Sequence, residues 1–350
     1  MQKPNKIDVF LYSSKSQAFS NTDEQKLRRF YKNALELNDV KYINNPIDDN
    51  IKIVHFVKLE DYKKFNSFRN KKFIKIVNLF IDDKPGPKNV VSKNKNKETN
   101  EIEYHIPKKE TELLNEFDTI IVPTLLTKKF LIEEGVNRII EVLNPPVKLT
   151  KVDLELSEIA NIAYIYFHLE ENAKFLLVLL DYQDKEAAER VQILASIYKE
   201  YRFLVCTDDL NSKNGKDVRK VFKRHPSNII IATNVAEDVY YSALYRSEGV
   251  LLLNDTPHYS LEIMEALAAK KHLLALETSV IKDMIIDKIN GHVYNDFASL
   301  IQGIDEVSKG KLLDLRANGY EFAFKSRIQA IGEKLVEIYR KTLKEINNQW

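Results

Sequence analysis

Six basic side chains lie close together in the first quarter of the chain: Lys63, Lys64, Arg69, Lys71, Lys72 and Lys75. They fall within thirteen residues that contain no acidic residue, and Phe65, Phe68 and Phe73 lie between them. Exposed cations beside exposed aromatic rings bind anionic membrane surfaces, at about 1 kcal/mol per cation close to the surface. The same pattern is typical of a solvated helix rim whose phenylalanines face the core. Both interpretations stay open from the sequence.

Two other side chains with reactive chemistry lie in apolar segments. His55 belongs to the apolar run 51–57, where a histidine is more often a core residue than a catalytic one. Cys206, the only cysteine, ends the apolar run that starts at Phe203, so we expect a buried thiol. A single cysteine excludes a disulfide framework and a cysteine zinc cluster, and it fits a reducing cytoplasm.

Short apolar runs alternate with amphipathic helical segments along the chain, which predicts βαβ units and parallel sheets covered on both faces. Strands are predicted in the first half at residues 7–12, 40–43, 51–57, 73–80 and 119–122, and in the second half at 175–180, 203–206, 229–232, 250–253 and 272–276. Helices are predicted at residues 23–37, 59–68, 110–116, 124–134, 185–200, 218–224, 236–245, 259–270 and 297–307, and over most of 312–348.

The connection Asn144-Pro145-Pro146-Val147 divides this pattern, because two prolines exclude both a helix and a central strand. We therefore predict an N-terminal Rossmann-like domain at residues 1–146 and a second one at 147–325. A closing helix is predicted at 326–350. Residues 82–107 are too polar to build a core, and we expect a mobile surface insertion or a lid over a cleft.

The composition limits the classes of partner. The 53 Lys and Arg against 51 Asp and Glu give a net charge of +2, which argues against a nucleic-acid partner. No apolar run approaches the roughly 20 residues of a membrane span, and the first residues lack the apolar core of a secretory signal. We expect a cytoplasmic protein that works at a membrane, if at all, from the inner surface. Glycine is rare, with 9 residues, and the first is Gly86.

The second half contains a recognisable signature. The segment 245–276, YRSEGVLLLNDTPHYSLEIMEALAAKKHLLAL, resembles the donor site of family-4 retaining glycosyltransferases with the GT-B fold. The turn Ile289-Asn290-Gly291-His292-Val293-Tyr294 is similar to the family's "vNGxLv" motif, and the helix around Ile338-Tyr339 to its closing helix. With the match over 119–144, the resemblance covers residues 119–343.

The resemblance implies two Rossmann-like domains that face each other across a cleft, with the C-terminal helix packed back on the first domain. Glu265 then contacts the ribose of a nucleotide sugar, because a carboxylate offers two acceptor oxygens to a diol. Lys185 and the N-terminus of the following helix bind the diphosphate. No metal is required, since cations and the helix dipole stabilise the leaving group. The remaining donor-site candidates are His258, Tyr259, Ser260 and Leu261.

The chain also departs from the family pattern. Pro257 occupies the position of the first motif glutamate, and Leu180 that of the arginine before Lys185. The loop 13–21, which is glycine-rich in the family, contains no glycine. Asn78 stands where the family commonly has a catalytic histidine, and His55 is the remaining histidine nearby. His55 and Asn78 are therefore the catalytic candidates.

We expect a hexosyltransferase that uses a UDP-linked nucleotide sugar as donor. The expected acceptor is a glycolipid or cell-envelope glycan, and the expected reaction retains the anomeric configuration. The alternative is a catalytically degenerate GT-B protein that serves as a binding or complex-forming subunit. A sugar-nucleotide epimerase on the same fold is a third interpretation.

Overall fold

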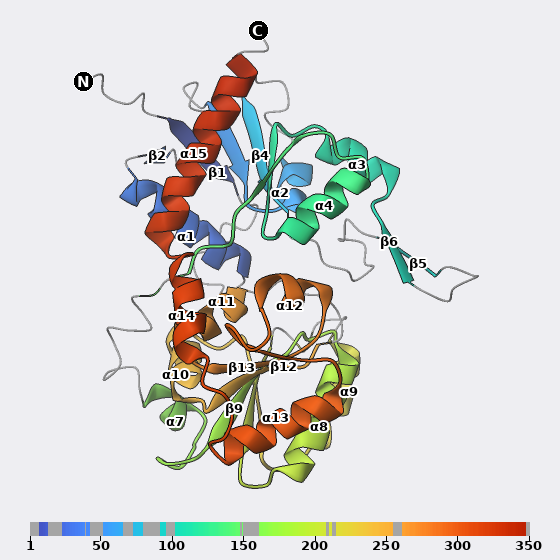
Figure 1. Cartoon of the computed structure of the whole chain (residues 1–350), viewed down its shortest axis with the longest axis vertical. Helices are drawn as coiled ribbons and strands as arrows, with labels where there is room; N and C mark the ends of the chain where they lie inside the picture. Colours follow the sequence, from blue (N-terminus) through green and yellow to red (C-terminus); the bar gives the residue numbers. More distant parts are fainter. Residues whose placement is uncertain are drawn as a thin grey trace. The chain divides into compact units, whose positions relative to one another are not determined.

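The computed structural model describes residues 7–12, 23–38, 40–42, 52–65, 73–79, 92–95, 102–147, 149, 161–207, 210–211, 215–254 and 261–347 (Figure 1). The chain forms two compact units. Unit 1 consists of Met1–Pro146 and Lys325–Trp350, and unit 2 of Val147–Phe324.

Unit 1 is built on a parallel sheet of six strands. Its spatial order is β2-β1-β3-β4-β7-β8. All four residues of β3, IVHF, and of β7, TIIV, are buried, as expected for central strands covered on both faces. The strands are β1 (Asp8–Tyr12), β2 (Lys41–Tyr42), β3 (Ile53–Phe56), β4 (Ile74–Asn78), β7 (Thr119–Val122) and β8 (Ile139–Val142).

Helices cover both faces of this sheet. On one face Phe56, Phe65 and Phe117 pack edge to face in an apolar cluster with residues of α2, α3 and α4. On the other face α1 packs along α15, the C-terminal helix. Gly332 of α15 allows this close approach, because a Cβ there would lie 2.5 Å from the Ala34 carbonyl oxygen. The helices are α1 (Asp23–Leu37), α2 (Leu59–Lys64), α3 (Lys108–Leu114), α4 (Leu125–Glu133) and α15 (Ile328–Asn347).

The polar segment 82–107 contains regular structure that the sequence did not predict. Strands β5 (Ser92–Lys95) and β6 (Ile102–His105) form an antiparallel pair, with Ser92 opposite His105. The pair forms a separate two-stranded sheet. Ile102-Glu103-Tyr104-His105-Ile106 alternates apolar and polar residues, a pattern that favours a strand, whereas Ser92–Lys95 contains no apolar residue.

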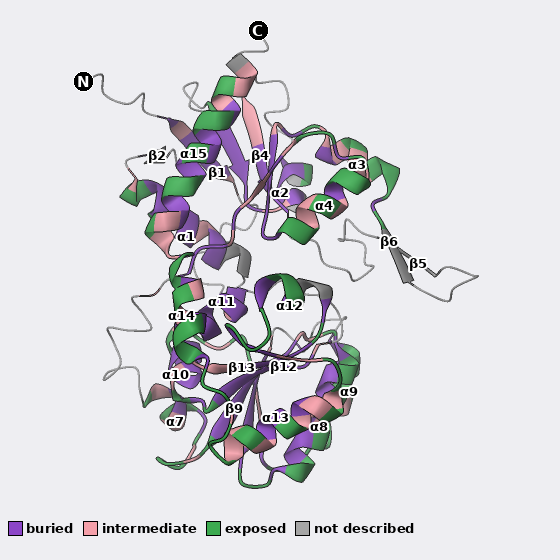
Figure 2. Ribbon diagram, in the orientation of Figure 1, coloured by how far each residue is buried: buried purple, intermediate pink, exposed green. Residues whose placement is uncertain are grey.

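Unit 2 repeats the plan with a second six-stranded parallel sheet, in the order β11-β10-β9-β12-β13-β14. Figure 2 shows its strands buried and its helices exposed along their outer faces. The strands are β9 (Phe175–Leu179), β10 (Arg202–Thr207), β11 (Ile229–Thr233), β12 (Gly249–Leu252), β13 (His272–Leu276) and β14 (His292–Tyr294).

The helices of unit 2 lie on the two faces of its sheet (Figure 1). One face packs against α8, α9 and α13 in a continuous apolar core. On the other side α10 contacts α7, and α11 contacts α14. The helices are α7 (Ile162–Tyr166), α8 (Lys185–Ile197), α9 (Lys216–Val221), α10 (Glu237–Arg246), α11 (Leu261–Ala268), α12 (Ser279–Met284), α13 (Phe297–Ser308) and α14 (Arg316–Phe324).

The turn after α11 shows how the chain manages with little glycine. Lys270 has φ +55°, a left-handed conformation that favours glycine. Its ammonium group lies 4.4 Å from the centre of the Tyr320 ring, a cation–π contact that offsets part of the backbone strain.

We predict that Lys270→Gly stabilises unit 2 by about 0.5 kcal/mol. Relief of the left-handed strain is worth about 1 kcal/mol, and loss of the exposed cation–π contact costs about 0.5 kcal/mol. The measurement is the denaturant midpoint of the variant. The matched control is Lys309→Gly, whose backbone is right-handed at φ −89°, so that glycine there should lower the midpoint. A lower midpoint for Lys270→Gly would contradict the prediction.

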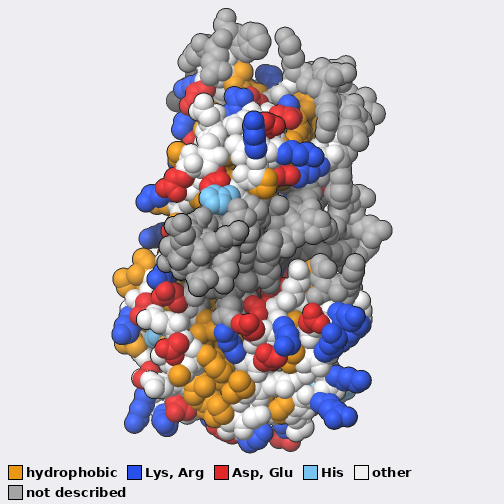
Figure 3. Space-filling view, turned by 90° about the vertical axis from the view of Figure 1, so that its right-hand side faces the viewer, with side chains coloured by type: hydrophobic (Ala, Val, Ile, Leu, Met, Phe, Trp, Pro, Cys, Tyr) orange, Lys and Arg blue, Asp and Glu red, His pale blue; other side chains and the backbone are white. Residues whose placement is uncertain are grey.

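No helix among the described residues is long and apolar enough to cross a bilayer. On the face of the molecule in Figure 3, basic and acidic side chains are interspersed over the described atoms of both units.

Candidate functional site

The strand order in the sheet of unit 2 reverses between β9 and β12, which makes this place a topological switch point. The chain leaves β9 toward β10 on one side, whereas β12 pairs with β9 on the other. In open parallel sheets, ligands bind at the carboxyl ends of the strands at such a switch point. Here the two loops that leave the strands are in contact, since the Asp181 backbone N–H donates to Asn254 Oδ1 at 3.4 Å. The helices that follow, α8 and α11, start at Lys185 and Leu261.

The first turn of α8 presents Lys185 at this edge. The helix begins at Asp184, whose carboxylate accepts the Ala187 N–H at 3.0 Å. Lys185 is exposed and pairs with Glu189 at 2.9 Å, which raises the pKa of the lysine. The ammonium group is thus charged and accessible. To bind a phosphate, it would have to break its ion pair with Glu189 or contact both groups at once.

Leu180, which stands where the resembled family has an arginine, is buried in the core beneath α8. Further along α8, Arg190 donates to the Leu253 carbonyl oxygen at 2.8 Å, and its guanidinium lies 5.8 Å from the centre of the Phe297 ring. Arg190 was not predicted from the sequence, and its hydrogen bond ties α8 to the end of β12.

Glu265 of α11 is a buried, hydrogen-bonded acid. It is 1% exposed, and its Oε1 accepts a hydrogen bond from the Tyr241 hydroxyl at 2.7 Å. Burial and the carboxylate hold the pKa of Tyr241 well above its usual value, so the phenol stays protonated and donates. The sequence did not predict this partner, because a tyrosine on α10 is typical of a helix core. The glutamate is therefore fixed on one side by α10.

Tyr240 lies within electrostatic range of Glu265, Glu262 and Cys206. Glu265 and Glu262 both raise the pKa of Tyr240 in addition to its burial. Burial raises the pKa of the Cys206 thiol to about 12, with a smaller effect of Glu262. The prediction of a buried thiol is confirmed, and the thiol is neutral and unreactive at physiological pH.

Three donor-site candidates, His258, Tyr259 and Ser260, lie outside the described residues, as does Pro257. Leu261 opens α11 and is buried. The structure therefore gives contacts for Lys185, Leu261 and Glu265, on α8 and α11 at neighbouring strands, and their role in donor binding stays a prediction.

The catalytic candidates of unit 1 lie together in its interior. His55 of β3 and Asn78 of β4 point to the sheet face covered by α1 and α15, and both are buried. His55 Nδ1 lies 2.8 Å from the Tyr339 hydroxyl, and the Tyr31 hydroxyl donates to Asn78 Oδ1 at 3.3 Å. Burial lowers the pKa of His55 to about 4, with Asn78 opposing the shift. The imidazole is thus neutral and in contact with the C-terminal helix, and its catalytic role stays a prediction.

The described members of the basic cluster make contacts within unit 1. Lys63 pairs with Glu110 at 2.9 Å, and the Lys75 ammonium lies 5.4 Å from the centre of the Tyr62 ring. Phe65 is buried in the core, and Phe73 packs against it. Phe68, Arg69, Lys71, Lys72 and the side chain of Lys64 lie outside the described residues.

Comparison with known proteins gives matches in structure. No family model and no curated protein sequence matches the chain. A glycosyltransferase from Rickettsia africae ESF-5 matches with a TM-score of 0.70 and 15% identity, over 97% of this chain and 99% of that one. A sucrose-phosphate synthase from Thermosynechococcus elongatus matches with a TM-score of 0.73 and 10% identity, over 97% and 100%. Anabaena HepE, solved in complex with UDP and glucose, matches with a TM-score of 0.70 and 12% identity, over 96% and 99%.

These matches extend over both units and nearly the whole length of each compared chain. The chain has the GT-B fold, an α/β architecture of two Rossmann-like domains, and the fold prediction is confirmed.

Proposed function

We propose that the protein is a glycosyltransferase of the family-4 type that transfers a hexose from a nucleotide sugar, UDP-linked, with retention of the anomeric configuration. The observation that carries the proposal is the switch point of unit 2, where the helix that follows β12, α11, holds a buried Glu265 that is hydrogen-bonded to Tyr241. HepE, of the same fold, has been solved in complex with UDP-glucose.

The residues at this edge suit the chemistry of a nucleoside diphosphate sugar. Lys185 is exposed at the start of α8, where the partial positive charge of the helix terminus adds to its own. Together they favour the developing charge of the departing diphosphate, so that no metal ion is needed in this proposal. Glu265 is proposed to accept the two ribose hydroxyls while Tyr241 holds its other side.

Titration calorimetry of the full-length protein with UDP-glucose, UDP-galactose and GDP-mannose tests the proposal. At least one donor should bind, and slow hydrolysis of that donor to free nucleotide should follow without an acceptor. Absence of binding across a broad nucleotide-sugar panel would exclude the proposal.

One observation favours a second candidate function, a catalytically degenerate GT-B subunit. Leu180 is a core residue at the position of the family's diphosphate-binding arginine, and each lost charge-assisted contact costs about 1.5–3 kcal/mol. Calorimetry separates the two candidates, because a degenerate subunit binds no donor or binds one without turnover.

For the acceptor, we propose a glycolipid or cell-envelope glycan reached from the inner membrane surface. The support is the basic cluster between Lys63 and Lys75, although its described aromatic residues Phe65 and Phe73 face the core of unit 1. Membrane binding would therefore depend on charge rather than on inserted rings.

We predict that the protein floats with anionic liposomes at low salt and that Lys71→Glu/Lys72→Glu lowers the bound fraction. Two cations near the surface contribute about 2 kcal/mol, so the double reversal should weaken binding about 30-fold or more. The measurement is flotation at two salt concentrations. The control is the reversal of two exposed lysines outside the cluster, Lys311 and Lys334, and equal flotation of the wild type and the cluster variant would remove the cluster from the proposal.

A further inference from the structure

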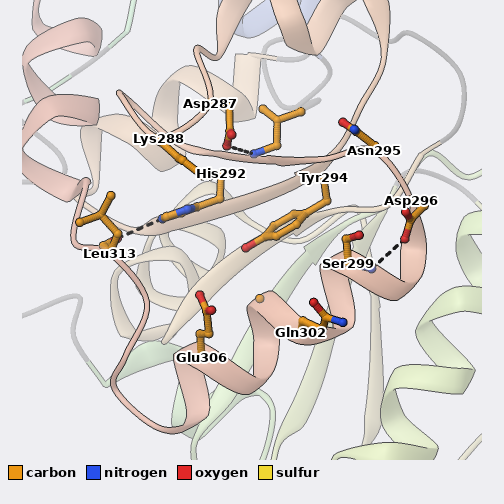
Figure 4. Close-up of a pocket in the computed structure, with 12 residues that line it drawn as sticks. Asp287, Lys288, His292, Tyr294, Asn295, Asp296, Ser299, Gln302, Glu306 and Leu313 are labelled. Carbon is orange, nitrogen blue, oxygen red and sulfur yellow. Dashed lines mark hydrogen bonds between the residues drawn. The ribbon is translucent and has the colours of Figure 1, made fainter.

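Unit 2 contains a polar cavity at the edge strand of its sheet, away from the switch point. Its volume is about 420 Å³. It lies between β14 and α13, with the segment before β14 on its far side (Figure 4). Strand β14 is separated from β9 by β13 and β12, so the cavity belongs to another part of the sheet than Lys185 and Glu265.

The ring of Tyr294 lies across the middle of this cavity, with its hydroxyl toward α13 (Figure 4). Gly303 of α13 makes this position possible, because a Cβ there would lie 2.0 Å from the Tyr294 hydroxyl. Glycine inside a helix costs about 0.5–1 kcal/mol, and this chain has few glycines. The glycine at this site is thus explained by the tyrosine that it accommodates.

The tyrosine supplies both an apolar face and a hydrogen-bond donor. Burial raises the pKa of Tyr294 to about 12, with Glu306 and Asp287 adding to the shift. The phenol is therefore protonated at physiological pH and can donate to a ligand oxygen. The ring is half-buried, which leaves part of its face toward the cavity.

Acceptor groups from three segments surround the ring. Asp287 accepts the Val293 N–H at 2.9 Å, and Asp296 accepts the Ser299 N–H at 2.8 Å, so both carboxylates are fixed and keep further acceptor capacity. Glu306 lines the cavity from α13 (Figure 4).

The amide side chains of Asn295 and Gln302 complete the lining, and an amide can both donate and accept. The lining contains three carboxylates and one lysine, Lys288. Among the described residues no group of three His, Cys, Asp or Glu could hold a metal ion, so the carboxylates are spread around the cavity rather than gathered at one point.

We propose that this cavity binds a neutral or amino sugar, as a carbohydrate site separate from the donor site. Spread carboxylates match the hydroxyl donors of a pyranose, the two amides match its mixed donors and acceptors, and an aromatic face suits its apolar C–H side. A ligand that carries phosphate or carboxylate is disfavoured, because three carboxylates against one lysine repel it.

Saturation-transfer NMR and calorimetry of the full chain test the site, with glucose, galactose, N-acetylglucosamine, glucosamine and maltose as probes and without nucleotide. At least one sugar should bind. Glu306→Gln with Gln302→Ala should weaken its binding at least 10-fold, while Glu321→Gln on α14, exposed and outside the cavity, should leave it unchanged. Both cavity positions are exposed, so the double variant is expected to fold, which circular dichroism checks.

The same experiment separates the alternatives. Glucose 6-phosphate should bind at least 10-fold more weakly than the free sugar, and Glu265→Gln should leave sugar binding unchanged. The proposal is overturned if no probe binds, if glucose 6-phosphate binds more tightly than glucose, or if Glu265→Gln abolishes the signal and so places it at the donor site. Nucleotide binding is not needed for any of these results, and failure of the proposed function would leave this test intact.

Discussion

Glu265→Ala should weaken binding of the donor nucleotide sugar by about 10- to 100-fold. The carboxylate is proposed to accept charge-assisted hydrogen bonds from the ribose, and such bonds contribute about 1.5–3 kcal/mol. Glu265→Gln keeps the size of the side chain and one acceptor oxygen, so its loss should be smaller. Calorimetry with the donor that the wild type binds gives both values.

Tyr241→Phe is the matched control for this prediction, because it removes the hydrogen bond to Glu265 Oε1 and leaves the carboxylate in place. It should lower the stability of unit 2 by about 1 kcal/mol and change donor affinity less than threefold. Glu265→Ala also leaves the buried Tyr241 hydroxyl without this acceptor, so its stability is measured in parallel. If the two variants lose donor affinity equally, Glu265 acts by holding α10 and α11 together and not by touching the nucleotide.

The sequence pattern predicts the central elements of both sheets closely. The predicted helix 23–37 and strand 119–122 have the same bounds as α1 and β7. Two strands of the six-stranded sheets were not predicted, β8 and β14, and each lies at an edge. The sequence of β8, IIEV, does not alternate apolar with polar residues, and that of β14, HVY, is too short to show any period.

The C-terminal segment shows what the apolar spacing can and cannot locate. The sequence predicts that residues 312–348 are almost wholly helical, with a closing helix at 326–350, and the structure has α14 and α15, which end at Phe324 and begin at Ile328. Neither proline nor glycine marks this break in the sequence. The division follows from packing, since α14 contacts α11 of unit 2 while α15 contacts α1 of unit 1.

The candidate site was predicted only where a side chain carries its own signal. Glu265 stands in a recognisable strand–loop–helix segment, but its partner Tyr241 lies 24 residues away on another helix.

The positions of the few glycines also depend on contacts that the sequence does not show. Lys270 adopts the left-handed turn without glycine, whereas Gly303 and Gly332 are kept where a Cβ would collide with Tyr294 or the backbone of α1.

Tyr339→Ala should lower the stability of unit 1 by about 3–5 kcal/mol, because it removes a fully buried aromatic ring from α15. The same helix is held by a hydrogen bond between the Thr119 and Thr342 hydroxyls at 2.8 Å. Tyr339→Phe keeps the ring and loses only the contact with His55, so we expect about 1–2 kcal/mol. Thermal unfolding measures both, with Lys334→Ala, exposed on the same helix, as the control that should change little.

This contact also makes unit 1 sensitive to acid. Because burial lowers the pKa of folded His55 to about 4, and an unfolded histidine has a pKa near 6.5, protons bind preferentially to the unfolded chain between these values. The contribution of neutral His55 is complete above about pH 6.5 and is lost at about 1.4 kcal/mol per pH unit as the pH falls toward 4. His55→Gln keeps a polar partner for Tyr339 but cannot titrate, so its stability should fall less steeply over this range. Equal slopes for the wild type and His55→Gln would show that the imidazole is not buried in the folded protein, and His55 would then return as an accessible catalytic candidate.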